Sequence, residues 1–129
     1  QELSDFIGQL SDNDDPCATL GLFITDYAAY VALPENALLG VEILTEALRN
    51  PAIAEVFGRN RNRLIIALAE CITQGTKSGV FAPQIDPPVV ACMILDALEG
   101  QGLHSLSSPS EDNLARNAVS SFILNGLKP

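Results

Sequence analysis

The stretch DPPVVACMILDALEG, residues 86–100, decides how this chain must fold, because it predicts a helix that is apolar on more than one side. Asp86 can cap this helix by accepting a hydrogen bond from its first N–H groups, and Pro87 fits its first turn. Seven apolar residues then follow in a row, from Val89 to Leu95. A helix on the surface of a small domain usually buries one apolar stripe and exposes the rest to water. This helix therefore needs to be covered on two sides.

Two apolar faces adjoin each other when these residues are placed on a helical wheel. One face has to meet the core of its own domain. The other has to meet either another helix of this chain or the same helix of a second molecule, which would build a four-helix bundle from two helices of each chain. The pattern leaves open which face meets which partner. The faces consist of Ala91, Leu95, Leu98 and Gly102 on one side and of Val90, Met93, Ile94 and Ala97 on the other.

The starts of the remaining helices are marked by a polar residue directly followed by proline. Each such pair predicts a helix N-terminus, with the polar side chain as the cap, and Pro34 can start a further helix. Gly79 is typical of the residue just after a helix C-terminus, and GVFAPQI (79–85) predicts a connector because its proline disfavours a central strand. The pairs are Asp15-Pro16, Asn50-Pro51, Asp86-Pro87 and Ser108-Pro109.

The chain is therefore expected to be one all-α domain of about six helices, with no internal repeat. Its 129 residues suit a single domain that buries a core without metal or disulfide support, and 47% of them are apolar. The expected helices span residues 3–10, 16–32, 34–49, 51–78, 87–103 and 109–127.

The charge balance makes nucleic acids and anionic membranes unsuitable partners for this chain by itself. Seven basic residues against 16 acidic ones give a net charge of −9, which repels both the nucleic-acid backbone and an anionic membrane surface. No signal peptide and no uncharged apolar run of about 18 residues is present, so we expect no membrane partner and a cytoplasmic protein. Because the chain begins at Gln1, we expect it to be a fragment of a longer protein or the ordered part of one.

No motif in the sequence predicts catalysis, a metal or a cofactor. The single histidine, His104, is near the end of an expected helix and has no cysteine close to it in sequence. Cys71 and Cys92 stand in apolar stretches, which indicates unreactive core thiols. The one basic cluster, RNRNR at 59–63, fits either a solvated helix surface or a site for an acidic or anionic partner. We therefore predict a protein that is not an enzyme.

A stripe with two phenol groups is the best candidate for a binding site. Phe23, Tyr27 and Tyr30 recur at three- and four-residue spacing on the expected helix 16–32. Tyrosine offers a large apolar body and one polar tip, which suits an amphipathic small molecule. Ordinary core packing is the alternative explanation of the same stripe.

The order of helix junctions resembles that of a known family. The matching features are the junction EALRNP (46–51), the long helix ending in GTKSGVF (75–81), the short linker to IDPPVVA (85–91) and the ending DALEGQGL (96–103), followed by a final amphipathic helix. From about residue 16 to the end, the chain resembles the C-terminal regulatory domain of TetR-family (tetracycline-repressor-like) transcription regulators.

The resemblance implies a ligand-sensing and dimerisation domain of a repressor. Residues 1–15 would be the end of a linking helix and a loop, 16–86 the helices around a ligand cavity, and 87–129 the dimerisation helices. A small amphipathic or apolar effector, whose identity the sequence does not give, would then release operator DNA. The family's basic helix-turn-helix is absent here, so operator DNA would be a partner only through that missing N-terminal domain.

Two sets of residues follow from this resemblance, one for the effector and one for the homodimer. The competing hypothesis is an all-α protein-interaction or scaffold domain that binds no small molecule. The cavity candidates are Leu20, Phe23, Ile24, Tyr27, Tyr30, Phe57, Leu64, Leu68 and Met93. The candidates for the dimer interface are Val90, Ile94, Ala97, Leu98, Leu114, Ala118, Val119, Phe122, Ile123 and Leu127.

Overall fold

The computed structural model describes residues 3–12, 14–107 and 112–129, with side chains from 116 onward in the last range. Throughout these ranges the secondary structure is helical and contains no strand, which confirms the prediction of an all-α fold. The expected helix ranges agree with the observed ones to within a few residues. The helices are α1 (Leu3–Leu10), α2 (Pro16–Ala32), α3 (Pro34–Ala47), α4 (Pro51–Lys77), α5 (Pro87–His104) and α6 (Asp112–Gly126).

Two of the predicted helix caps are confirmed and one is wrong. The side chain of Asp15 accepts a hydrogen bond from the N–H of Ala18 at 3.1 Å. Asn50 accepts one from the N–H of Ala52, also at 3.1 Å. Asp86 makes no such bond, although α5 begins where expected, because proline alone sets the backbone angle of the first turn.

The end of α4 confirms the role predicted for Gly79. This glycine has φ +82°, a left-handed conformation that glycine adopts without a steric penalty. The N–H of Val80 donates to the carbonyl of Gly75 at 2.9 Å, and the N–H of Gly79 donates to that of Thr76 at 3.2 Å. This pair of bonds is the Schellman motif, which pairs carbonyl groups that the helix end would otherwise leave free. The predicted cap pair Ser108-Pro109 lies outside the described residues.

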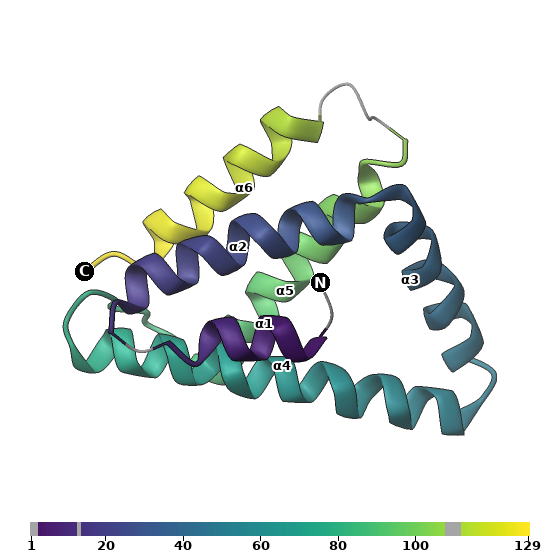
Figure 1. The fold of residues 1–129 in the computed structure, drawn as a ribbon, viewed down its shortest axis with the longest axis horizontal. Helices are drawn as coiled ribbons and strands as arrows, with labels where there is room; N and C mark the ends of the chain where they lie inside the picture. Colours follow the sequence, from purple (N-terminus) through teal and green to yellow (C-terminus); the bar gives the residue numbers. More distant parts are fainter. Residues whose placement is uncertain (1–2, 13, 108–111) are drawn as a thin grey trace.

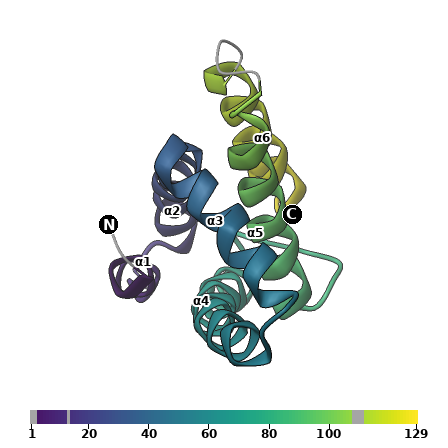
Figure 2. The same cartoon turned by 90° about the vertical axis from the view of Figure 1, so that its right-hand side faces the viewer.

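Helices α2 and α4 lie in the middle of the fold, and the other helices pack around them. In Figure 1, α2, α3 and α4 form three sides of a triangle, and α5 crosses from α2 to α4. The views from two directions place α1 on one side of α2 and α4 and place α5 and α6 on the opposite side (Figure 2). Helix α5 packs against α2, α3, α4 and α6, so it is the central element.

The apolar core lies where α1, α2, α4 and α5 meet. Leucine and isoleucine fill most of it, with Phe6 and Phe23 as its largest side chains. Its fully or almost fully buried members are Phe6, Leu10, Leu20, Phe23, Ile24, Leu64, Leu68, Ile72, Ala91, Leu95 and Leu98. Among the described residues, no single helix has the length and composition to cross a bilayer, and α2 with α3 matches them only as a pair bent by 78°.

The first apolar face predicted for α5 is buried inside the chain itself, and the second face is buried in part. On the first face Ala91, Leu95 and Leu98 are buried, and so are Val90 and Ile94 on the second. The sequence left open whether the second face meets another helix of this chain or a second molecule. Val90 and Ile94 of this face pack in the chain's own core, because α5 has neighbouring helices on several sides, whereas Met93 and Ala97 stay exposed.

A stripe at the outer side of the second face of α5 remains uncovered. It carries Val89, Met93 and Ala97, which are exposed and follow one another at four-residue spacing. Asp96 is also exposed, while Glu99 is half-buried, so the polar arc of this helix is only partly in contact with water.

Candidate functional site

A cavity of about 240 Å³ opens beside the aromatic side chains of α1 and α2. Four helices contribute to its wall, which places residues far apart in the sequence around one space. Most of the wall is apolar, and a polar group from α4 and α5 closes one part of it. The lining residues are Leu3, Phe6, Tyr27, Tyr30, Phe57, Asn60, Arg61, Leu64 and Glu99.

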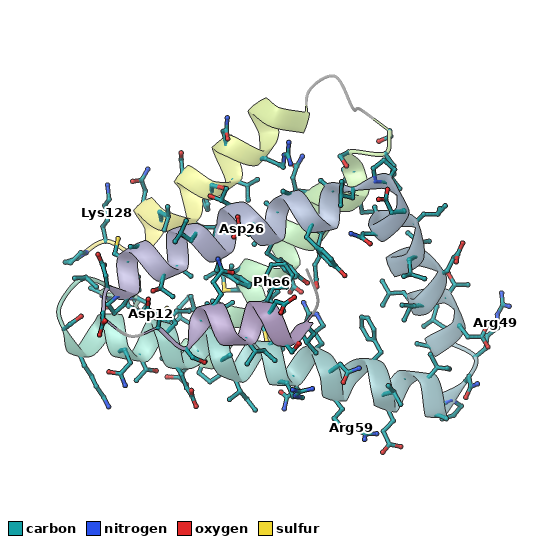
Figure 3. The ribbon with its side chains drawn as sticks, in the orientation of Figure 1. Phe6, Asp12, Asp26, Arg49, Arg59 and Lys128 are labelled. Atoms are coloured by element: carbon teal, nitrogen blue, oxygen red, sulfur yellow. The ribbon has the colours of Figure 1, made fainter. Side chains whose placement is uncertain are left out.

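Aromatic rings from α1 and α2 form the apolar part of the wall. The ring of Phe6 meets Tyr27 and Tyr30 edge to face, with centroids 5.2 Å and 5.3 Å apart. Tyr27 in turn stacks on Phe23, with centroids at 5.2 Å. Both arrangements are favourable for rings, whose faces are negative and whose edges are positive. Phe6, labelled in Figure 3, lies where α1 meets α2, so it joins α1 to this cluster.

The polar part of the wall belongs to a hydrogen-bonded group of four side chains, of which Tyr27, Arg61 and Glu99 line the cavity and Asp96 does not. The hydroxyl of Tyr27 donates to Oε2 of Glu99 at 2.8 Å. Arg61 donates from Nε and Nη2 to Oε1 of Glu99, at 3.2 Å and 2.8 Å, and from Nη2 to Oδ1 of Asp96 at 2.7 Å. The side chain of Arg61 is 22% exposed and that of Glu99 34%, whereas Asp96 is 71% exposed. Such charge-assisted bonds hold the guanidinium and both carboxylates in place.

The surroundings of this group shift the pKa values of Tyr27 and Arg61 upward. Burial raises the pKa of Tyr27, and the charge and hydrogen bond of Glu99 raise it further. Burial by itself would lower the pKa of Arg61, but the hydrogen bond and charge of Glu99, helped by Asp96, outweigh that effect. The phenol therefore stays a hydrogen-bond donor and the guanidinium stays charged at any physiological pH.

Four of the nine predicted cavity residues line this space, and five do not. Tyr27, Tyr30, Phe57 and Leu64 lie on the wall. A helical stripe shows which side of a helix faces inward, but it does not show how far along the helix a cavity extends. The side chains of Leu20, Phe23, Ile24 and Leu68 are buried in the core, away from this wall, and Met93 is exposed on the outer side of α5.

Sequence reasoning missed the other five lining residues. Leu3 and Phe6 belong to the short first helix, which the resemblance treated only as the end of a linker. Arg61 and Glu99 stand on the polar arcs of their helices, and such arcs normally face water. The only signal for Arg61 was its place in the basic cluster 59–63, and Asn60 belongs to the same cluster.

The residues expected at a dimer interface fall into three groups in the single chain. Exposed positions are available to a second molecule, and buried ones are not. Ala97, Ala118 and Phe122 are exposed, and Val119 and Ile123 are half-buried against the core. Val90, Ile94, Leu98 and Leu127 are buried in the chain's own core. The side chain of Leu114 lies outside the described residues.

The cysteines and acidic residues suggest no second chemical site. Burial raises the pKa of the Cys71 thiol to about 11, so this thiol stays protonated and unreactive. Cys92 is half-buried and Cys17 is exposed. Over the part of the chain that the structure describes, no three His, Cys, Asp or Glu side chains are grouped so that they could hold a metal ion.

Comparison with known proteins shows a similarity of fold. Neither a family model nor a curated protein sequence matches this chain. The fold is similar to that of the crystal structure of a TetR transcription regulator from Haloarcula marismortui ATCC 43049, with a TM-score of 0.78 and 21% sequence identity. The match covers 98% of this chain and 69% of that one. Over nearly its whole length, this chain therefore has the fold of a TetR transcription regulator.

Proposed function

We propose that this chain is the effector-sensing and dimerisation part of a transcription regulator. The observation that carries the proposal is the cavity between α1, α2, α4 and α5, which combines aromatic rings with one organised polar group. Sites for small molecules are typically apolar hollows with a few fixed polar groups that orient the ligand. The likeness to a TetR transcription regulator supports the choice of a regulator over an enzyme.

The cavity wall suggests how an effector would act on DNA binding. Leu3 and Phe6 bring α1 into the wall, and Glu99 brings in α5. An effector would thus contact both α1 and the central helix of the domain. A ligand shifts a conformational equilibrium only through unequal affinity for the two states. We propose that the effector favours a position of α1 in which a DNA-binding domain preceding it in the parent protein no longer fits its operator.

The experiment that tests effector binding is a thermal-shift measurement with 4-phenylbutan-1-ol, a small molecule with one ring and one polar end. Binding to the folded state raises the melting temperature, and about 2.7 kcal/mol of stabilisation is expected at a hundredfold excess over Kd. Asn60→Phe places a ring at the cavity wall and should abolish this shift. Asn62→Phe, a matched change at an exposed position of α4 that does not line the cavity, should keep it. An equal shift in both variants would place the binding elsewhere.

One observation favours the competing hypothesis of a protein-interaction domain. Helix α3 exposes Leu38, Leu39 and Leu44, and Leu48 just after its end is exposed as well. Exposed apolar patches often mark contacts with other proteins. In that case the cavity would have no ligand, and no small probe would raise the melting temperature of the wild-type chain.

We further propose that α5 and α6 pair with the same helices of a second molecule. The exposed stripe of Val89, Met93 and Ala97 on α5 is apolar, and Phe122 on α6 is 81% exposed. Since α5 and α6 pack against each other, a two-fold axis would bring four helices together and cover both. Of the interface residues expected from the sequence, Ala97, Ala118 and Phe122 fit this proposal best.

Phe122→Glu is expected to convert a dimer into a monomer. A carboxylate placed in an apolar interface would lose its hydration without gaining a partner, which costs several kcal/mol. Leu48→Glu is the matched control, because Leu48, the residue just after α3, is 89% exposed and is not part of the proposed interface. Light scattering after gel filtration at micromolar concentration gives the mass. A dimer that survives Phe122→Glu, or one that only Leu48→Glu disrupts, would contradict the proposed interface.

A further inference from the structure

The polar group at the cavity is negatively charged, although it contains an arginine. Arg61 supplies one positive charge and Asp96 and Glu99 supply two negative ones, so the group carries a net charge of −1. Of these three residues, Arg61 and Glu99 line the cavity, and Asp96 bonds to Arg61 from outside the lining. The surrounding chain adds to this potential, with a formal net charge of −9. A ligand in the cavity is therefore in a negative potential, which favours a positively charged molecule.

Glu99 still has room for a further hydrogen-bond donor. Its Oε1 accepts the two bonds from Arg61, but its Oε2 accepts only the one from Tyr27. A carboxylate can accept about four hydrogen bonds, two at each oxygen. Since Glu99 lines the cavity and its side chain is 34% exposed, a ligand can approach this carboxylate.

Arg61 is less suited to receive an anionic ligand. Its Nε and Nη2 already donate to the two carboxylates, and Nη2 is shared between them. An incoming carboxylate would have to lie close to Asp96 and Glu99, and like charges at such distances repel each other. The arginine thus fixes the position of Glu99, and its single positive charge is already balanced by two carboxylates.

The aromatic residues of the same cavity also favour a cation. Phe6, Tyr27, Tyr30 and Phe57 all line it, and the face of an aromatic ring attracts a positive charge within about 6 Å. Tyr27 connects the two parts of the wall, because its ring stacks in the aromatic cluster while its hydroxyl bonds to Glu99. One ligand can therefore contact the rings and the carboxylate at the same time.

From these observations we propose that the effector is an organic cation, namely a lipophilic amine or ammonium compound whose charged head lies beside Glu99 and whose apolar body contacts the rings. This inference rests on the proposed function, since it assumes that the cavity takes a small molecule. The cavity volume of about 240 Å³ is slightly below the roughly 300–1,000 Å³ of typical ligand sites, which indicates a compact molecule with one ring.

Three probes of equal shape and different charge test this inference. They are 4-phenylbutylamine, 4-phenylbutan-1-ol and 4-phenylbutyrate, which are cationic, neutral and anionic at pH 7. Calorimetric titration of the wild-type chain in low salt should give a Kd about tenfold lower for the amine than for the alcohol, and weaker binding for the carboxylate. The preference for the amine should decrease as sodium chloride is added.

Glu99→Gln removes the charge and keeps the shape of the side chain. In this variant the amine and the alcohol should bind with Kd values that agree to within about threefold. Glu70→Gln is the control, because Glu70 is an exposed residue of the same protein outside the cavity, and it should leave the preference unchanged. If Glu99→Gln does not fold, Asp96→Asn removes one of the two negative charges at a largely exposed position and should reduce the preference as well.

The outcomes separate this inference from the proposed function. If the alcohol binds and the amine binds no better, or if the carboxylate binds most tightly, the inference is wrong and the cavity remains an effector site. A preference for the amine that persists in Glu99→Gln and Asp96→Asn would also overturn it. If none of the three probes binds to the wild-type chain, the proposed function fails together with the inference.

Discussion

Gly102→Ala is expected to destabilise this fold by about 3 kcal/mol, because the new methyl group has no space. A Cβ atom at this position would lie 2.6 Å from the carbonyl oxygen of Val31 and 2.8 Å from its carbonyl carbon. These are backbone atoms of α2, so they cannot rotate away as a side chain can. Helix α5 would have to move away from α2, which disturbs the packing of Leu95 and Leu98 in the core. A decrease in Tm of roughly 10 °C is the corresponding thermal effect.

Gly58→Ala is the matched control for this prediction. Gly58 lies inside α4, and a Cβ atom there would meet no other atom within 4 Å. Since alanine favours a helix over glycine by about 1 kcal/mol, this variant should be as stable as the wild type or more stable. Urea unfolding, monitored by circular dichroism at 222 nm, measures the free energy of unfolding of both variants. If Gly102→Ala is as stable as Gly58→Ala, the close approach of α5 to α2 does not exist in solution.

The helices could be predicted from the sequence because their boundaries depend on local chemistry. Pro16 and Pro51 occupy first turns whose caps, Asp15 and Asn50, are the residues just before them. Gly79 ends α4 for an equally local reason, its positive φ. At Asp86 the same rule gave the right start but the wrong cap, because proline is sufficient to begin a helix without a side-chain hydrogen bond.

The neighbours of each helix face could not be predicted in the same way. The wheel of α5 indicated two apolar faces, and helices of the same chain bury the first face and half of the second. The exposed stripe combines Met93 and Ala97 of the second face with Val89, which the wheel assigned to neither face. The number of helices around a given helix depends on the tertiary fold. It therefore cannot be predicted from the sequence of that helix alone.

The polar part of the cavity could not be predicted from the sequence either. Arg61 and Glu99 are 38 positions apart in the sequence and belong to helices that meet only after folding. Each residue alone fits a solvated surface, which is the usual place for a charged side chain. Tyr27, which does line the cavity, could be identified as a cavity candidate because its helix stripe is a local pattern. The carboxylate that accepts its hydrogen bond could not.

Phe6→Ala is the second change with a large expected effect. In this variant α1 should detach from the rest of the domain. Phe6 is 1% exposed and its ring meets those of Phe23, Tyr27 and Tyr30. Truncating such a buried phenylalanine typically costs about 3–5 kcal/mol. Helix α1 has only eight residues, and helices of that length are not stable in water by themselves.

The polar contact between α1 and α2 cannot replace the lost packing. Gln9 donates from Nε2 to Oδ2 of Asp26 at 2.9 Å, but its own Oε1 is buried with no hydrogen-bond partner among the described residues. An unpaired buried carbonyl costs about 1–3 kcal/mol, which offsets most of what the bond contributes. We therefore expect the truncated α1 to unfold locally while α2, α4 and α5 remain folded.

Hydrogen exchange of the backbone amides measures this local unfolding. In Phe6→Ala the amides of α1 should exchange at rates close to those of an unfolded peptide, while those of α4 and α5 should stay protected. Gly8→Ala is the control in the same helix, because a Cβ atom there meets nothing within 4 Å and should strengthen α1. Unchanged protection of α1 in Phe6→Ala would show that the ring cluster does not hold it.

If α1 is released as expected, Leu3 and Phe6 leave the cavity wall. Binding of 4-phenylbutan-1-ol should then weaken in Phe6→Ala and persist in Gly8→Ala, which would connect the effector site to the one helix through which we propose that it acts.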